Sequence, residues 1–223
     1  MTFKSRRDAG RKLALRLSAY KDACPVVLAL PRGGVPVAYE VARALNAPLD
    51  VIVVRKLGAP GQPELGIGAI VDGDHPRSVL NEDVVRALDV PKEYVQREVD
   101  LELREIRRRQ EIYRRGRRPE PIEGRTAIVV DDGIATGGSV RAALRGVRRS
   151  RPKRLVLAVP VAPEETIESL REEADEVVCL STPPYFHAVG QFYDDFRQTS
   201  DEEVVQLLDA AGQSGAEPLP GDC

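Results

Sequence analysis

The sequence has few of the residues on which many catalytic sites depend. Its 223 residues include two histidines, three cysteines, one methionine and no tryptophan. Two histidines disfavour both a histidine-based zinc site and a Ser-His-Asp triad. The cysteines, Cys24, Cys179 and Cys223, are odd in number and far apart, which disfavours a disulfide framework or a cysteine-rich metal site. This cysteine usage favours a cytoplasmic location.

Long apolar runs and a strong excess of one charge are also missing. No stretch of about 18 apolar residues occurs, so we expect no membrane span. The charged N-terminal residues lack the continuous apolar core of a signal peptide. A net charge of −2 gives no general reason to expect nucleic-acid binding. The length suits one sizeable α/β domain, or at most two small ones.

Short apolar runs alternate with amphipathic segments along the chain. The runs lie at 26–30, 51–54, 65–71, 127–130, 155–159 and 177–180, and helical spacing covers 6–20, 35–45, 82–89, 92–115, 140–147 and 164–174. Apolar runs of this length between helices are typical of parallel strands that are buried on both faces. The alternation breaks at about 74–122, which predicts a helical insertion. The sequence therefore predicts an α/β fold, with a parallel sheet and helices on both faces.

One string combines carboxylates with a helix start. Residues 128–139 are Ile-Val-Val-Asp-Asp-Gly-Ile-Ala-Thr-Gly-Gly-Ser. An apolar strand leads to Asp131 and Asp132, and a turn of small residues leads to a helix that opens at Ser139. A helix N-terminus offers unpaired N–H groups to a phosphate, whereas carboxylates suit ribose hydroxyls, a developing positive charge or Mg²⁺. The structural alternative is an ordinary turn before an ordinary helix. The absence of Gly-Lys-Ser or Gly-Lys-Thr excludes a Walker loop.

This string resembles the phosphoribosyl pyrophosphate (PRPP) signature of type I phosphoribosyltransferases, which is several hydrophobic residues, Asp-Asp, three variable residues and Thr-Gly-Gly-Ser. The resemblance implies the type I phosphoribosyltransferase fold, with Asp131 and Asp132 holding the ribose hydroxyls directly or through Mg²⁺. It assigns the 5′-phosphate to five residues: Ala135, Thr136, Gly137, Gly138 and Ser139. The resemblance covers about residues 5–208, where the chain is most similar to a group of bacterial family members without an assigned substrate.

Two basic clusters follow other apolar runs. Pro31-Arg32-Gly33-Gly34 resembles the pyrophosphate loop of the family, which in relatives often carries a non-proline cis peptide bond. Arg55 and Lys56 resemble the basic pair beside pyrophosphate in purine-type members. A plain tight turn and a surface pair are the respective alternatives. Because ligands of parallel sheets bind at the carboxyl ends of strands, we expect the three clusters on one rim. The expected catalytic residues are Asp131, Asp132, Arg32 and Lys56.

The resemblance also suggests roles for two other segments. Residues 57–64 are placed like the mobile loop that covers the reacting centre, in which Glu64 has no assigned role. Residues 181–198 are placed like the hood over the base, and Tyr185 and Phe186 are the candidates to contact that base. A small hydrophobic plug is the equal alternative for these two rings. We expect a single domain at 1–211 and a disordered tail at 212–223.

Eight arginines lie between residues 104 and 118, in and just after the second half of the helix expected at 92–115, interspersed with acidic residues at helical spacing. Such spacing favours a solvated face, or a subunit contact as in a homodimer, over a nucleic-acid interface. We therefore do not expect nucleic acid among the partners.

The expected function is Mg²⁺-dependent transfer of the 5-phosphoribosyl group from PRPP to a nitrogen acceptor, in first place a nucleobase, within nucleotide metabolism. Electrostatic stabilisation of an oxocarbenium-like transition state needs no covalent nucleophile. Ala135 stands where members that act on 6-oxopurines generally carry an aspartate, which argues against hypoxanthine and guanine. The alternatives are a regulator that senses PRPP or a nucleotide without turnover, and a Mg²⁺-dependent phosphohydrolase with Asp131 as nucleophile.

Overall fold

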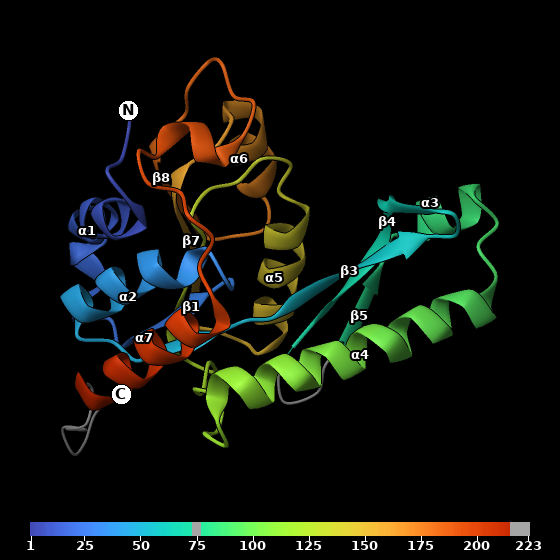
Figure 1. Ribbon diagram of the computed structural model, residues 1–223, viewed down its shortest axis with the longest axis horizontal. Coiled ribbons are helices and arrows are strands. Elements are labelled where there is room, and N and C mark those ends of the chain that lie inside the picture. The colour runs from blue at the N-terminus through green and yellow to red at the C-terminus, as the bar shows by residue number, and fades with distance from the viewer. Residues whose placement is uncertain (73–76, 215–223) are drawn as a thin grey trace.

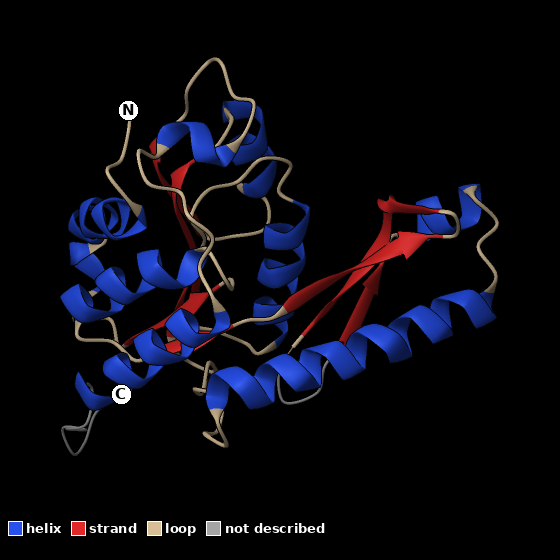
Figure 2. Ribbon diagram, viewed as in Figure 1, coloured by secondary structure: helices blue, strands red, loops and turns tan. Residues whose placement is uncertain are grey.

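A five-stranded parallel sheet forms the centre of the body. The computed structural model describes residues 1–72 and 77–214. The strand order is β2-β1-β6-β7-β8. These strands are β1 (Pro25–Ala29), β2 (Leu49–Val51), β6 (Thr126–Val130), β7 (Arg154–Val161) and β8 (Glu176–Ser181). Helices lie on both sides of this sheet (Figures 1 and 2). The predicted α/β fold with a parallel sheet is confirmed.

Two helical layers cover the sheet because its strands are apolar on both faces. The helices are α1 (Arg6–Arg16), α2 (Gly34–Leu45), α5 (Gly138–Arg149), α6 (Glu164–Leu170) and α7 (Asp201–Ser214), with single turns at η1 (Ser18–Tyr20) and η2 (Val189–Phe192). Val27 and Ala29 of β1 pack in the core under α1, α2 and α7, whereas Val26 and Leu28 pack under α5 and α6. Successive side chains of a strand point to opposite faces, so a doubly covered strand must be apolar throughout.

The segment between β2 and β6 forms an arm that projects from the body (Figure 1). It consists of β3 (Val54–Ala59), β4 (Gln62–Val71), β5 (Arg77–Leu80), α3 (Glu82–Ala87) and α4 (Lys92–Arg114). The three strands form an antiparallel sheet of their own. The predicted helices at 82–89 and 92–115 are confirmed. The prediction of a helical insertion at about 74–122 missed β5 and the separate sheet.

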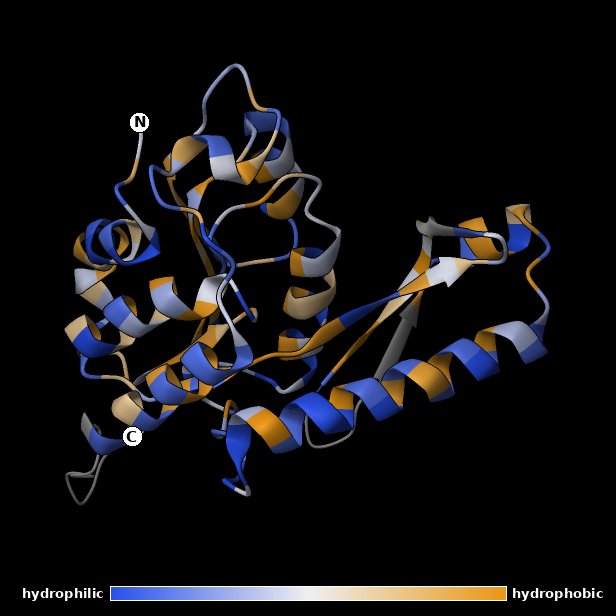
Figure 3. Cartoon of the chain, in the orientation of Figure 1, coloured by the Kyte–Doolittle hydropathy of each residue, from blue (hydrophilic) through white to orange (hydrophobic). Residues whose placement is uncertain are grey.

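Helix α4 covers the arm sheet with its apolar stripe. Apolar and polar residues alternate along it (Figure 3). Ile106 and Tyr113 are fully buried, and Val95, Val99 and Leu103 pack against the same core. This is the face that the helical spacing predicted, and it secures the arm to the body.

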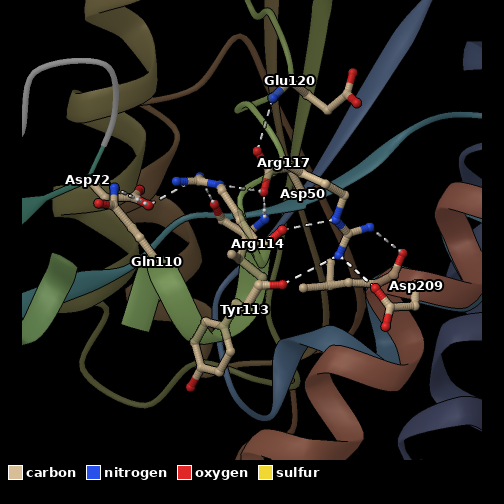
Figure 4. A network of polar contacts seen from close by, with 10 residues as sticks. Asp50, Asp72, Gln110, Tyr113, Arg114, Arg117, Glu120 and Asp209 are labelled. Atoms are coloured by element: carbon tan, nitrogen blue, oxygen red, sulfur yellow. Dashed lines mark hydrogen bonds and ion pairs between the residues drawn. The ribbon is translucent and has the colours of Figure 1, made fainter. Parts of the chain in front are cut away.

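A buried arginine at the end of α4 ties the arm to the body (Figure 4). The Nε of Arg114 lies 3.0 Å from Asp50 Oδ1, and one Nη lies 3.2 Å from Asp72 Oδ2. The same Nη donates to the carbonyl of Val51 at 2.9 Å. A cavity of about 470 Å³ at this junction is lined by these residues and by the C-terminal half of α5. Arg114 therefore bridges β2, in the body, and the end of β4.

The expected tail falls mostly outside the described residues. Residues 212–214 belong to α7, and residues 215–223 are not described. Across 1–72 and 77–214, none of the helices combines the length and the apolar character that a bilayer-spanning segment needs.

Candidate functional site

Two motifs that lie about a hundred residues apart in the sequence meet at the carboxyl ends of β1 and β6. These strands are parallel neighbours, so the loops that follow them emerge side by side. A Cβ built on Gly33 would lie 2.1 Å from Asp132 Oδ2, and one on Gly34 would lie 2.8 Å from the carbonyl oxygen of Val130. The peptide bond between Pro31 and Arg32 is cis, as expected. The Arg-Gly-Gly loop and the acidic pair therefore share one rim.

The small-residue loop after the acidic pair presents unpaired donors. Gly137 has φ +77°, which favours glycine, and no side chain caps α5. Ala135, Thr136 and Gly138 are exposed. Within the described part of the chain, the backbone N–H groups of 135–139 donate no hydrogen bond to protein. The Thr166 hydroxyl supports this loop from α6 by donating to the carbonyl of Ala135 at 2.9 Å. The arrangement suits an anion at a helix N-terminus.

The acidic pair lies in surroundings that disfavour two negative charges. Burial raises the pKa of Asp131 well above its ordinary value, and the neighbouring Asp132 charge raises it further. Burial also raises the pKa of Asp132, while the guanidinium of Arg6 opposes that rise. The backbone N–H of Asp132 donates to Asp131 Oδ1 at 2.8 Å. Adjacent buried carboxylates of this kind are stabilised by a cation or by hydroxyl donors.

Arg6 is a residue of this site that sequence reasoning missed. It is the first residue of α1, and its Nε lies 2.7 Å from Asp132 Oδ2. Its Nη1 donates to the carbonyl of Arg197 at 2.7 Å, and its guanidinium lies 3.9 Å from the centroid of the Phe196 ring. No local signal distinguishes Arg6 from Arg7 in the sequence, because the contact spans 126 positions.

The pyrophosphate loop has its own supports. The guanidinium of Arg32 lies 3.8 Å from Asp201 Oδ1, at the start of α7. The buried Tyr113 of α4 donates its hydroxyl to the same oxygen at 2.7 Å. Asp201 and Tyr113 were not predicted as site residues, and both come from elements outside the two motifs.

The structure places Arg55 and Lys56 differently from the prediction. They do not end a strand of the parallel sheet, because β2 stops at Val51 and both residues lie inside β3 of the arm. Arg55 pairs with Glu102 of α4 at 2.5 Å, and Lys56 is exposed. Among the described residues, no hydrogen bond or ion pair joins either one to the acidic pair. Their role toward pyrophosphate stays a prediction.

The segment expected as a mobile loop, 57–64, is mostly paired. β3 and β4 form a hairpin through it, with Ala59 opposite Gln62. Only residues 60–61 lie outside the strands. The segment is therefore a hairpin and not the expected open loop, since the backbone pairing of β3 and β4 extends to Ala59 and Gln62.

The hood packs against the acidic loop. The Tyr193 hydroxyl donates to the carbonyl of Asp132 at 2.5 Å. A Cβ on Gly133 would lie 2.5 Å from the Val189 side chain. The two candidate base contacts differ in their surroundings. The ring centroid of Phe186 lies 5.2 Å from that of Phe192, whereas Tyr185 is 81% exposed. Phe186 thus takes part in a hydrophobic plug, and Tyr185 leaves its ring accessible.

Comparisons with known proteins agree with these features. The phosphoribosyl transferase domain profile matches residues 4–197. Over 215 residues the chain is 52% identical to Rv0571c of Mycobacterium tuberculosis H37Rv, named provisionally as a phosphoribosyl transferase. That match covers 96% of this chain and 48% of the relative, so the chain spans about half the length of the curated relatives it matches.

Two solved structures share the fold of this chain. The chain matches the crystal structure of TT1426 from Thermus thermophilus with a TM-score of 0.82 and 46% identity, over 93% of this chain and 98% of that one. AQ2163 from Aquifex aeolicus shares the fold with a TM-score of 0.50 at 13% identity, over 83% and 78% of the two chains. Sequence profile, relatives and motif geometry agree, and the chain belongs to the phosphoribosyl transferase domain family.

Proposed function

We propose that the chain transfers the 5-phosphoribosyl group from PRPP to a nitrogen acceptor, with a nucleobase as the leading class, and releases pyrophosphate. The observation that carries the proposal is the contact of Gly33 and Gly34 with the acidic pair. It sets the carboxylates between the unpaired backbone N–H groups at the start of α5 and the Arg32-Gly33 loop before α2. In that loop the N–H groups of Gly34 and Val35 already donate to the carbonyls of Leu30 and Arg32. A sugar with an anionic group at each end matches that charge pattern. The proposal places the protein in cytoplasmic nucleotide metabolism.

The donor set fits Mg²⁺ bound together with substrate. Across the described residues, no group of three or more His, Cys, Asp or Glu side chains is arranged for a metal. Two carboxylates alone agree with the way Mg²⁺ binds, through one or two protein carboxylates plus substrate phosphates and water. Asp131 and Asp132 would hold it, directly or through water and ribose hydroxyls. When bound, the ion would neutralise charge on the diphosphate.

The residues of the chain would act by position and charge. In the reaction, a nitrogen lone pair forms a bond to C1 of the ribose, and the C1–O bond breaks with its electrons leaving on pyrophosphate. A proton of the acceptor nitrogen passes to solvent. The carboxylates of Asp131 and Asp132 would stabilise the positive charge that develops on the sugar. Arg32 and the N–H of Gly33 would hold the departing diphosphate, and the hood would exclude water.

The decisive experiment measures pyrophosphate release from PRPP and Mg²⁺ across purines, pyrimidines and small nitrogen compounds. Release with one acceptor would establish both the reaction and the substrate. PRPP binding without release from any acceptor would instead identify a sensing regulator. Phosphate release without an acceptor, with a phosphoaspartate at Asp131, would identify a phosphohydrolase.

A matched pair of variants tests the assignment to this site. Asp132→Asn should lower turnover by orders of magnitude while the protein remains folded. Asp83→Asn, on the exposed surface of α3, removes the same charge without touching the site and should leave turnover unchanged. Unchanged turnover in Asp132→Asn would remove this carboxylate from the mechanism.

A further inference from the structure

The guanidinium of Arg6 lies between the acidic pair and the pyrophosphate loop. The side chains of Arg6 and Asp132 are only 11% and 13% exposed. The Oδ2 atom of Asp132 that accepts from Arg6 is also the atom that a Cβ on Gly33 would strike. The guanidinium therefore lies where the acidic pair meets the pyrophosphate loop.

The guanidinium is held from two sides that do not involve the acidic pair. The carbonyl of Arg197 accepts from Nη1, and the ring of Phe196 lies under the guanidinium. Within residues 1–72 and 77–214, Nη2 donates to no protein acceptor. Arg6 would thus stay in place with donors to spare when Asp132 turns toward another partner.

Ligand binding would change the contacts of the Asp132 carboxylate. Ribose hydroxyls and Mg²⁺ would compete with Arg6 for this carboxylate, because both favour the same oxygen atoms. A guanidinium that loses part of its carboxylate contact in a buried place needs another anion. Its planar set of donors matches a phosphate group well, and the diphosphate is the anion expected beside Gly33.

We propose that Arg6 is a substrate-binding residue that balances Asp132 in the free protein and contacts the diphosphate of PRPP in the loaded site. The inference rests on the proposed function, since it assumes that PRPP binds here. The competing explanation is a purely structural ion pair that ties α1 and the hood to the loop. The two explanations differ in which part of PRPP should bind more weakly when Arg6 is replaced.

Calorimetric binding in the presence of Mg²⁺ separates them with three probes: PRPP, inorganic pyrophosphate and ribose 5-phosphate. For Arg6→Gln we expect the Kd of PRPP and of pyrophosphate to rise about tenfold or more, as loss of a charge-assisted hydrogen bond predicts. The Kd of ribose 5-phosphate, which has no diphosphate, should not rise. Arg16→Gln removes the same charge at the far, exposed end of α1 and should leave all three unchanged.

Other patterns overturn the inference. Equally weakened binding of ribose 5-phosphate and pyrophosphate would show a structural role for Arg6. Unchanged pyrophosphate binding would show that Arg6 does not contact the diphosphate. Should Arg6→Gln fail to fold, Arg6→Lys keeps the charge and loses the planar donors. It should then bind pyrophosphate at least about threefold more weakly, and unchanged affinity would refute the inference. A wild-type protein that binds neither PRPP nor ribose 5-phosphate would refute the proposed function itself.

Discussion

Gly33 leaves no room for a side chain beside Asp132. An ideal Cβ at this position would lie 2.1 Å from Oδ2 and 2.7 Å from Cγ of that carboxylate. Both distances are below any real contact of a Cβ atom. The close approach exists because β1 and β6 are adjacent parallel strands whose following loops cross the same rim. Glycine here sets how near the pyrophosphate loop and the acidic pair can come.

Gly33→Ala should therefore lower PRPP-dependent turnover by about a hundredfold or more, because a displacement of about 1 Å at a reacting centre has effects of that size. Pyrophosphate release measures this loss. Gly66→Ala is the control, because a Cβ on Gly66 of β4 meets nothing within 4 Å. Similar turnover in the two variants would contradict the close contact.

The buried Tyr113 supports Arg32 through Asp201. Its hydroxyl and the Arg32 guanidinium lie 2.7 and 3.8 Å from the same carboxylate oxygen of Asp201. Arg32 is 35% exposed, so solvent screens part of this interaction. We expect Asp201→Asn and Tyr113→Phe to raise the Kd of pyrophosphate by about three- to tenfold, since a net contribution near 1 kcal/mol corresponds to that range.

The same two variants should leave ribose 5-phosphate binding unchanged, which separates positioning of Arg32 from a general loss of structure. Glu203→Gln, in the first turn of α7 and exposed, serves as the charge control. If the binding of pyrophosphate and of ribose 5-phosphate weakens equally, or if neither changes, Asp201 does not position Arg32.

Asp72 makes the junction of arm and body sensitive to pH. Burial raises its pKa to about 6, although the charge of Arg114 and a hydrogen bond from Gln110 act in the opposite direction. The unfolded chain should titrate this group near about 3.9. Because the folded state holds the proton more tightly, this group favours folding fully below about pH 4. The contribution is lost as the pH rises through about 6.

Asp72→Asn mimics the protonated acid at every pH. The free energy of unfolding of this variant, relative to wild type, should therefore increase between about pH 4 and 6, by on the order of 2 kcal/mol. Denaturant titrations of both proteins at several pH values measure this difference. The contributions of the other carboxylates are common to both proteins and cancel. Asp83→Asn, which is exposed, should show no such trend. A constant difference for Asp72→Asn would mean that its pKa is not raised.

The sequence was sufficient for the parts that depend on local pattern. The doubly buried strands are continuous apolar runs, so β1, β6, β7 and β8 were predicted close to their actual places. In the arm, the strand predicted at 65–71 is confirmed as part of β4, but the separate sheet was not predicted. The reason is that β2 and β3 lie in one β-branched run that Ile52 and Val53 interrupt without any turn residue. Backbone pairing in the arm, rather than composition, divides that run.

The site shows the same division between local and distant information. The phosphate loop and the acidic pair are contiguous, and they could be recognised from one string. Arg6 and Asp201 lie far from it in the sequence and reach it only through the fold, so no spacing rule could find them. Arg55 shows the converse, because a basic residue with a suggestive neighbour is engaged by Glu102 in a different element.

The two aromatic candidates of the hood predict opposite outcomes. Tyr185 is largely exposed and makes no ring contact in the described residues, so its removal costs the folded protein little. If it stacks on the acceptor, Tyr185→Ala should raise the KM of that acceptor about fivefold or more, since base–aromatic stacking contributes about 1–3 kcal/mol. The Kd of PRPP should not change, because in this reading the ring contacts only the acceptor.

Phe186→Ala is the matched variant, since its ring packs against Phe192 beside Val189. It should lower the free energy of unfolding by about 1–3 kcal/mol, a value below that of a fully buried phenylalanine. Acceptor kinetics and denaturant titrations on both variants separate the roles. A stability loss in Tyr185→Ala with an unchanged acceptor KM would make the whole cluster a plug, and the base contact would then have to come from another part of the rim.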